Sequence, residues 1–281
     1  MLPLHKIHRV VLVVLDGLRP DAIDAFSLRH WQRLERSAAC SRAATTVTPS
    51  VTAAAMASLL TGARPSVHGL TSDRFHLPRR RGELQPLPQH LAHHGLLTAA
   101  FVRELPPLFR GVGARLATRL GVATPSFRGR SAPEIVMAAR GALSGRGRGL
   151  VLLHLPDADD AGHTHGWMSE EYGAASRRLD ESLGMIAALA GVGEDPGTLL
   201  VAMADHGGGG VVPSCHEAEH PLNRTIPMMF AGCAVTPERL PDGVSLLDVP
   251  PTICEVLGVP VHPTYVGRPL GALVMGATVA A

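Results

Sequence analysis

The feature that most constrains the fold of this chain is a continuous run of β-branched and aliphatic residues near its start, VVLVVLDG at residues 10–17. A run without alternating polar residues is typical of a strand buried on both faces, as in a parallel sheet. Residues 150–157 (LVLLHLPD) and 198–207 (TLLVAMADHG) have the same form. Residues 97–102 and 225–231 are weaker candidates. The sequence therefore predicts a sheet of several buried strands.

Helical patterns separate these strands. Residues 51–62 are rich in helix-forming residues and close with a glycine. Residues 169–190 carry apolar positions at helical spacing, and residues 249–258 form a third candidate helix. Strands that alternate with helices predict an α/β fold, a three-layer sandwich with a mostly parallel central sheet and helices on both faces.

The chain of 281 residues is expected to form a single domain over 1–281. Residues 72–130 differ from the rest because they are rich in Arg, Pro and Gly and have little periodicity. We interpret this segment as a cap or an insertion over the site, with a long surface excursion as the alternative.

Composition excludes two classes of partner. The formal net charge is +2, so no broad positive field indicates a nucleic-acid polymer or an anionic membrane. The apolar run at residues 10–15 is too short to span a bilayer and lacks a small-residue cleavage site, so we predict neither a membrane span nor a signal peptide.

Four separated cysteines without a C-x-x-C pair are typical of reduced thiols. We therefore expect a cytoplasmic location, and nothing in the pattern indicates an oligomeric state.

Three of the predicted strands end in acidic residues. Asp16 follows the first, Asp157 and Asp159 follow the second, and Asp205 follows the third. The carboxyl ends of parallel strands meet at one edge of a sheet, where such folds bind their ligands. These carboxylates are therefore expected to lie together.

Histidines accompany these acids. His163 lies four residues after Asp159, and His206 directly follows Asp205. Carboxylate and imidazole ligands together suit zinc or manganese better than calcium or magnesium. The pattern therefore indicates a metal site, although a solvated acidic loop is an equally good interpretation of the first cluster alone.

Hydroxyl groups precede the helix predicted at residues 51–62. Ser50 and Thr52 fall near its N-terminus, where free N–H groups and the helix dipole favour an anion. The pattern alone leaves open whether these residues cap the helix or belong to a catalytic site.

The segment HEAEH at residues 216–220 matches the H-E-x-x-H pattern of zinc proteases. That function needs the segment to lie on a stable helix. Pro213 and Pro221 bracket it, and a proline after His220 disfavours helical geometry at that residue. The match is therefore interpreted as accidental, although one of its histidines remains a candidate ligand.

Together these elements resemble the alkaline phosphatase superfamily, and within it the type I phosphodiesterase/nucleotide pyrophosphatase group that includes phosphonoacetate hydrolase. The motifs that carry the resemblance are VVLDG (13–17), PSVTAAAMASLLTG (49–62) followed by PSVHG (65–69), DDAGH (159–163), DHG (205–207) and DVPPTICEVLG (248–258). The resemblance covers most of the chain outside residues 72–130. It implies a metal-dependent enzyme with the alkaline phosphatase-like fold.

The resemblance also implies a role for individual residues. Thr52 would be the nucleophile, beside two divalent cations that are zinc or, alternatively, manganese. One cation would be bound by Asp16, Thr52, Asp205 and His206, and the other by Asp159, His163 and a late histidine. We assign that last ligand to His216, ten residues before Ile226, and keep His220 as the second choice. His165 and Asp157 are interpreted as outer residues rather than ligands.

The reaction implied is hydrolysis of a small phosphorylated substrate, a phosphodiester, phosphomonoester or phosphonate, through a covalent phospho-threonine. A phosphomutase or transferase, and a non-catalytic metal-binding relative, are the alternatives. A sulfatase is disfavoured because residues 40–44 (CSRAA) lack the C/S-x-P-x-R pattern.

One position departs from the family pattern. The nucleotide pyrophosphatases and phosphonoacetate hydrolase keep an Asn three residues after the nucleophile to hold a substrate oxygen, whereas this chain has Ala55. We therefore expect residues 72–130 to determine the substrate. Candidate phosphate or carboxylate contacts there are Arg74, Arg103 and Arg110.

Overall fold

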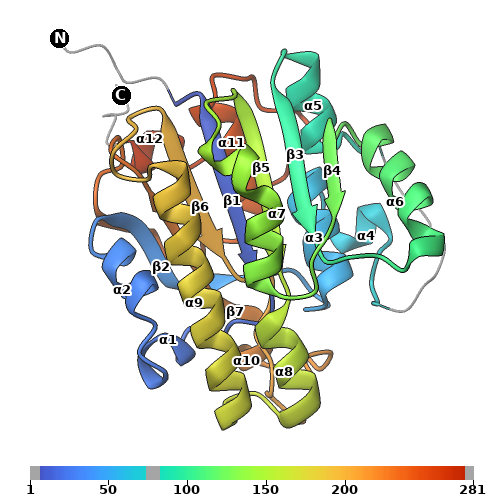
Figure 1. Ribbon diagram of the computed structural model, residues 1–281, viewed down its shortest axis with the longest axis vertical. Coiled ribbons are helices and arrows are strands. Elements are labelled where there is room, and N and C mark those ends of the chain that lie inside the picture. The colour runs from blue at the N-terminus through green and yellow to red at the C-terminus, as the bar shows by residue number, and fades with distance from the viewer. Residues whose placement is uncertain (1–6, 74–82, 276–281) are drawn as a thin grey trace.

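The centre of the molecule is a sheet of eight strands in a computed structural model that describes residues 7–73 and 83–275 (Figure 1). Their order across the sheet is β4-β3-β5-β1-β6-β7-β2-β8. The strands are β1 (Arg9–Leu15), β2 (Ala38–Thr45), β3 (Leu97–Val102), β4 (Thr124–Phe127), β5 (Gly149–Leu155), β6 (Thr198–Met203), β7 (Thr225–Ala231) and β8 (Glu238–Arg239).

The sheet is mostly parallel, as predicted. β1 is parallel to both of its neighbours, β5 and β6, and β3 is parallel to β5 and β4. Among the described strands, β7 alone runs in the opposite sense, antiparallel to β6 and β2. Every residue of β1 and β6 is buried, which explains why their sequences are continuously apolar.

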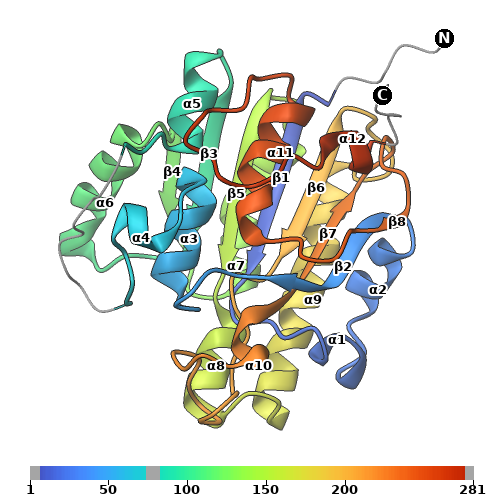
Figure 2. The same cartoon turned by 180° about the vertical axis from the view of Figure 1, so that it is seen from behind.

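Helices cover both faces of the sheet. α7 and α9 lie on the near face in Figure 1, and Figure 2 shows α3 and α11 on the opposite face. The predicted three-layer sandwich is therefore confirmed. The longer helices are α2 (Arg29–Glu35), α3 (Thr52–Thr61), α5 (Leu87–His93), α6 (Pro107–Arg119), α7 (Ala132–Ser144), α8 (Asp157–His165), α9 (Glu170–Ala190) and α11 (Val249–Val256). Short turns of helix are α1 (Ala22–Ala25), α4 (Pro65–His68), α10 (Pro221–Arg224), η1 (Leu246–Asp248) and α12 (Gly271–Val274).

The segment interpreted as a cap or insertion contributes directly to the sheet. Within residues 72–130, β3 and β4 extend the sheet beyond β5, and α6 lies beyond β4 at the edge of the molecule (Figure 1). Residues 74–82 lie outside the described residues. The action of this segment as a cap stays a prediction. Among the described helices, none combines the length and apolar character that crossing a membrane requires.

Arg9 connects the start of β1 to the ends of two helices. This side chain is 3 % exposed. Its Nη1 donates to the carbonyl oxygens of Leu143 (3.0 Å) and Gly145, and its Nη2 donates to Ala190 at 2.6 Å. Leu143 and Ala190 lie in the last turns of α7 and α9, where carbonyl groups lack helical partners and a cation is favourable. The buried guanidinium therefore satisfies backbone groups of both helices.

We predict that Arg9→Met lowers the free energy of unfolding by about 3–5 kcal/mol, because it leaves buried carbonyl groups without a donor. Urea unfolding followed by circular dichroism measures the change. Arg239→Met is the matched control, since the Arg239 side chain is 79 % exposed. A loss below about 1 kcal/mol for Arg9→Met would show that water replaces the guanidinium there.

Candidate metal centre

Acidic side chains converge at the carboxyl ends of three neighbouring strands, β5, β1 and β6. Asp16 directly follows β1, Asp159 lies in the first turn of α8 after β5, and Asp205 lies two residues after β6. Figure 1 shows α8 beneath this end of the sheet. The expected clustering of these carboxylates follows from the neighbouring positions of the strands.

The main chain holds this cluster together. The Asp159 N–H donates to the Asp16 carbonyl oxygen at 3.1 Å, and the Gly17 N–H donates to Asp205 Oδ1 at 3.3 Å. Gly17 has a φ of +69°, and a Cβ placed there would lie 2.9 Å from the Asp159 Cα. The glycine of the Asp-Gly motif is therefore required by a left-handed conformation and by close approach of α8.

Three histidines point the same ring atom into the cluster. The Nδ1 atom lies near a backbone carbonyl oxygen in each case, that of Ser214 for His163 (3.0 Å), of Gly207 for His206 (2.8 Å) and of Ser50 for His216 (2.7 Å). A carbonyl oxygen can only accept, so Nδ1 carries the proton. Nε2 is then the ring atom that can bind a metal once it carries no proton, the arrangement found in metal-binding histidines.

The Nε2 atoms lie close to the carboxylates and to one hydroxyl group. His206 Nε2 lies 3.0 Å from Thr52 Oγ1 and 3.2 Å from Asp16 Oδ1. Asp159 Oδ1 lies 3.5 Å from His163 Nε2 and 3.7 Å from His216 Nε2. The structure thus brings together all seven residues expected in the centre, and their role as ligands stays a prediction.

His154 is a further member of the cluster that the sequence analysis missed. It lies in β5, and its Nε2 is 3.2 Å from Asp16 Oδ2 and 3.8 Å from Asp205 Oδ2. Its sequence signal was a single polar residue near the end of an apolar run. Strand register, which places His154 opposite Val14, determines that its ring faces the site.

The donor set fits divalent cations. Ligand atoms of Asp159, His206 and His216 lie within 4.8 Å of one another, and so do those of Asp16, His154 and Asp205. Asp159 Oδ1 and Asp205 Oδ2 are buried and accept no hydrogen bond from the described chain. Buried carboxylate oxygens of this kind require a cationic partner. Mixed imidazole and carboxylate donors suit zinc or manganese.

The electrostatics of the cluster are those of a crowded buried site. Burial raises the pKa of Asp159 to about 8, and the negative charge of Asp16 adds to the effect. Burial alone would lower the pKa of His206, but the carboxylates of Asp205 and Asp16 raise it well above the usual value. Burial and the charge of His206 lower the pKa of His216 to about 3. Without a metal, these shifts favour the protonated forms of Asp159 and His206 and the neutral form of His216.

We predict that divalent ions displace these protons. Ligands must be deprotonated to bind. The pKa of Asp159 is raised to about 8 and that of His206 is raised by the neighbouring carboxylates, so binding at pH 7 should release about one proton or more per chain. The affinity should rise as pH increases from 6 to 8. Titration calorimetry with Mn²⁺ in two buffers of different ionisation enthalpy measures the release.

His220→Gln is the control for this titration. His220 Nδ1 accepts from the Leu222 N–H at 3.2 Å at the start of α10, away from the ring atoms described above. Its replacement should leave proton release unchanged. Binding heats that do not depend on the buffer would contradict the prediction.

The remaining candidate residues lie outside the cluster. Residues 216–220 are not helical, which agrees with rejection of the protease interpretation. Asp157 Oδ2 accepts from the Ala132 N–H at 2.6 Å at the start of α7, and His165 lies with Asp157 and Arg178 around a separate surface pocket. Ala55 is fully buried.

The candidate arginines have structural partners. Arg103 pairs with Asp160, the neighbour of Asp159, and Arg110 Nε donates to the Leu105 carbonyl oxygen at 2.8 Å. Arg74 lies outside the described residues. Close to Thr52, the Ala53 N–H at the start of α3 donates to Asp73 Oδ1 at 2.7 Å. An anion at this helix end would compete with that carboxylate.

The fold and the cluster define a member of the alkaline phosphatase superfamily, which is metal-dependent. The chain belongs to the type I phosphodiesterase / nucleotide pyrophosphatase family, whose model matches residues 10–234. The resemblance inferred from the motifs is therefore confirmed. The family and the two structures described below are phosphoesterase-type hydrolases, and a 2-O GAG sulfatase is also among the proteins of similar structure.

Two solved structures illustrate the shared fold. Murine ectonucleotide pyrophosphatase / phosphodiesterase 5, as an inactive variant in complex with AMP, has a TM-score of 0.70 at 14 % identity, covering 91 % of this chain and 96 % of that one. Phosphonate monoester hydrolase from Silicibacter pomeroyi has a TM-score of 0.68 at 15 % identity, covering 96 % of this chain and 77 % of that one.

A curated relative matches part of the chain. The 2,3-bisphosphoglycerate-independent phosphoglycerate mutase of Natronomonas pharaonis is 32 % identical over 146 residues. The match covers 50 % of this chain and 27 % of the mutase.

Proposed function

We propose that this chain is a metal-dependent phosphoester hydrolase with Thr52 as its nucleophile. The observation that supports it best is the position of the Thr52 hydroxyl. It lies at the N-terminus of α3, 3.0 Å from His206 Nε2, against buried carboxylates and imidazole lone pairs. A hydroxyl in such a place is suited to attack on an anionic ester that the helix end and bound cations would stabilise.

The proposal assigns each residue a place. Asp16, Thr52, Asp205 and His206 would hold one divalent cation, and Asp159, His163 and His216 would hold the other. When bound, the cations would lower the pKa of the hydroxyl and offset charge on the phosphoryl oxygens. Zinc is the proposed metal, and manganese is the alternative.

The covalent step is a substitution at phosphorus. A new bond forms between Thr52 Oγ1 and phosphorus as the bond to the leaving oxygen breaks, which gives a phospho-threonine. The hydroxyl gives up its proton, and the leaving group departs as an alcohol after taking one up from solvent. Water then cleaves this ester and restores the hydroxyl. The backbone carbonyl groups that hold His163, His206 and His216 keep their rings in position throughout.

His154 would act as a positioning residue in this scheme. Its ring faces the Oδ2 atoms of Asp16 and Asp205, on either side of it in the sheet. It would fix the orientation of two carboxylates that the proposal places on the same cation.

A phosphomutase or transferase is the second candidate, and the match to the phosphoglycerate mutase favours it. The two functions differ in their products, because a hydrolase releases phosphate without an acceptor alcohol. A non-catalytic metal-binding relative would release none.

The test is a substrate panel with zinc and with manganese. We expect release of p-nitrophenol from bis-p-nitrophenyl phosphate, p-nitrophenyl phosphate or p-nitrophenyl phenylphosphonate in buffer without an acceptor. No release from any of them by metal-loaded protein, together with transfer to an added alcohol, would replace the hydrolase with the transferase.

The partner and location follow the same proposal. The substrate would be a small phosphorylated molecule rather than a nucleic-acid polymer, and no membrane is involved. A cytoplasmic location is supported by the four cysteines, which are all unpaired in the structure.

A further inference from the structure

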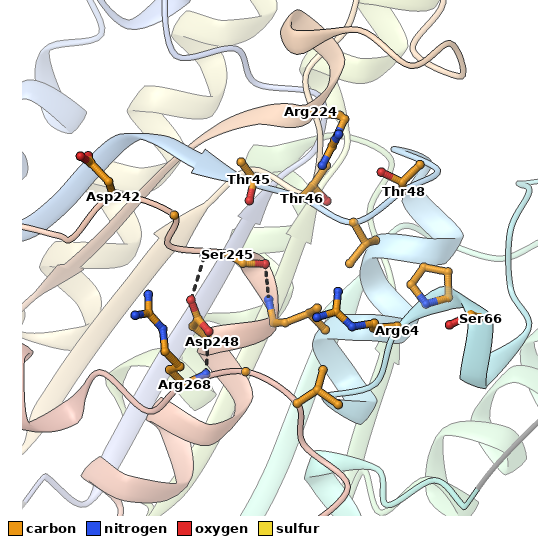
Figure 3. A pocket seen from close by; sticks show the side chains of 16 residues that line it. Thr45, Thr46, Thr48, Arg64, Ser66, Arg224, Asp242, Ser245, Asp248 and Arg268 are labelled. Carbon is orange, nitrogen blue, oxygen red and sulfur yellow. Dashed lines mark hydrogen bonds between the residues drawn. The ribbon is translucent and has the colours of Figure 1, made fainter.

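A polar cavity, apart from the metal centre, lies beside the segment that leads into α3. It has a volume of about 540 Å³ and is lined by residues 45–48, residues 64–66, Arg224, residues 242, 243, 245, 247 and 248, and residues 266–268 (Figure 3). None of the residues assigned to the metal centre lines it. The segment before α3 separates the cavity from the metal centre. Thr46 and Thr48 line the cavity, whereas Ser50 Oγ donates to the backbone carbonyl oxygen of His216 at 2.9 Å.

Three arginines from three separate parts of the chain surround this cavity. Arg64 precedes α4, Arg224 ends α10, and Arg268 follows α11. Figure 3 shows them on different sides of the opening, with Ser245 and Asp248 between them. Arg64 and Arg268 form no ion pair with any acid in the described chain. The guanidinium is the side chain best shaped to bind phosphate-type anions.

The two acids of the lining, Asp242 and Asp248, have partners other than the guanidinium groups of these arginines. Asp248 is buried, and its two oxygens accept from the backbone N–H groups of Ser245 (2.8 Å) and Arg268 (2.7 Å). Asp242 pairs with Arg239 at 3.3 Å on the surface. Arg224 Nη1 pairs with Glu219 at 3.3 Å, but this leaves its Nε free.

Two buried polar atoms of the lining have no partner. Thr46 is 3 % exposed, and its Oγ1 forms no hydrogen bond within the described residues. Arg224 Nε is likewise buried without an acceptor. The Thr46 N–H donates to the Arg224 carbonyl oxygen at 2.9 Å, which holds these two residues side by side. This hydroxyl and this guanidinium N–H in one wall are each able to donate to an acceptor group.

The walls are held by backbone contacts and need no rearrangement. Thr45 N–H donates to the Val244 carbonyl oxygen at 3.0 Å, and Val266 N–H donates to that of Gly62 at 2.9 Å. Asp248 connects the segment at Ser245 with the segment at Arg268, because its carboxylate accepts from the backbone N–H groups of both residues. Dashed lines in Figure 3 show these hydrogen bonds. A preformed cavity avoids the ordering cost of binding.

We propose that this cavity is an oxyanion-binding site for a phosphate group, separate from the metal centre and independent of metal. Arg64 and Arg268 would supply the charge, and Thr46 and Arg224 would donate to the oxygens of the anion. The same chemistry suits free phosphate and the phosphate group of a small ester.

The test uses the full chain after removal of divalent ions, with its folded state checked by near-ultraviolet circular dichroism. Calorimetric titrations use inorganic phosphate and, separately, phenyl phosphate. We expect saturable binding of one anion per chain, weakened at least about tenfold by Arg64→Gln/Arg268→Gln. Binding of inorganic phosphate assigns the site to the free anion, and binding of phenyl phosphate alone assigns it to an ester.

Two further variants distinguish anion binding in this cavity from attraction by positive charge elsewhere on the surface. Arg115→Gln/Arg119→Gln removes the same charge from the exposed surface of α6 and should bind as the unchanged protein does. Thr46→Val keeps the charge and shape but removes the hydroxyl, and it should weaken binding. The proposal is overturned if the metal-free chain binds neither anion, or if the two double variants lose affinity equally. Because no metal is present, these results do not depend on hydrolysis.

Discussion

Replacement of Thr52 by Ala is expected to reduce turnover of the best ester by at least about three orders of magnitude. The hydroxyl is the atom that forms the bond to phosphorus in the proposed reaction. It lies 3.0 Å from His206 Nε2, and the side chain of Ala cannot replace it. The other ligands are untouched, so the variant should still bind divalent ions. Steady-state kinetics and metal analysis of the same samples measure both effects.

Two controls make this result specific to Thr52. Thr61→Ala removes a hydroxyl from the other end of α3, where Oγ1 donates to the Ala57 carbonyl oxygen at 2.7 Å, and should keep full turnover. Acid quenching of the active protein during turnover should trap a chain heavier by one phosphoryl group, which keeps its second ester substituent if the substrate is a diester. This adduct should be absent in Thr52→Ala. Unchanged turnover by that variant would exclude the covalent route.

Replacement of Asp205 by Asn is expected to remove one cation and nearly all activity. Asp205 is fully buried, and its Oδ1 accepts from the N–H groups of Gly17 and His206. Asn retains the shape but replaces a charged ligand oxygen. We expect about one equivalent of metal to be lost on dialysis and turnover to fall by at least about a hundredfold.

Asp157→Asn is the matched control for this loss. Asp157 is also buried, but its carboxylate accepts from the Ala132 N–H and lies 3.6 Å from Arg178 Nε. Its replacement should leave the metal content unchanged. Full metal content in Asp205→Asn would show that this carboxylate is not a ligand.

The sequence predicted the centre of the fold better than its edges. β1, β5 and β6 are buried on both faces, so each appears as an apolar run that ends in an acidic residue. β2 was missed because AACSRAAT has neither alternation nor a continuous apolar run. Its place depends on antiparallel pairing with β7 and a short contact with β8. Such pairing is set by tertiary context, which local propensity does not record.

The site was predictable where residue type and chain order sufficed. The strand ends indicated Asp16, Asp159 and Asp205 with His163 and His206 beside them, and the family resemblance assigned the roles of Thr52 and His216. His154 could not be predicted in this way, because the face of a strand on which a residue lies depends on register. The cavity at Arg64 and Arg268 was also missed, since no motif connects segments that meet only in the folded chain.

The backbone contact between Gly17 and Asp159 limits how related proteins could evolve new substrate preferences. The turn after β1 and the first turn of α8 touch through backbone atoms, with no side chain between them. The separation of Asp16 and Asp159 is thus set by peptide geometry, and exchanging neighbouring side chains would not alter it. New substrates would have to be accommodated by remodelling the periphery, while the innermost spacing is inherited unchanged.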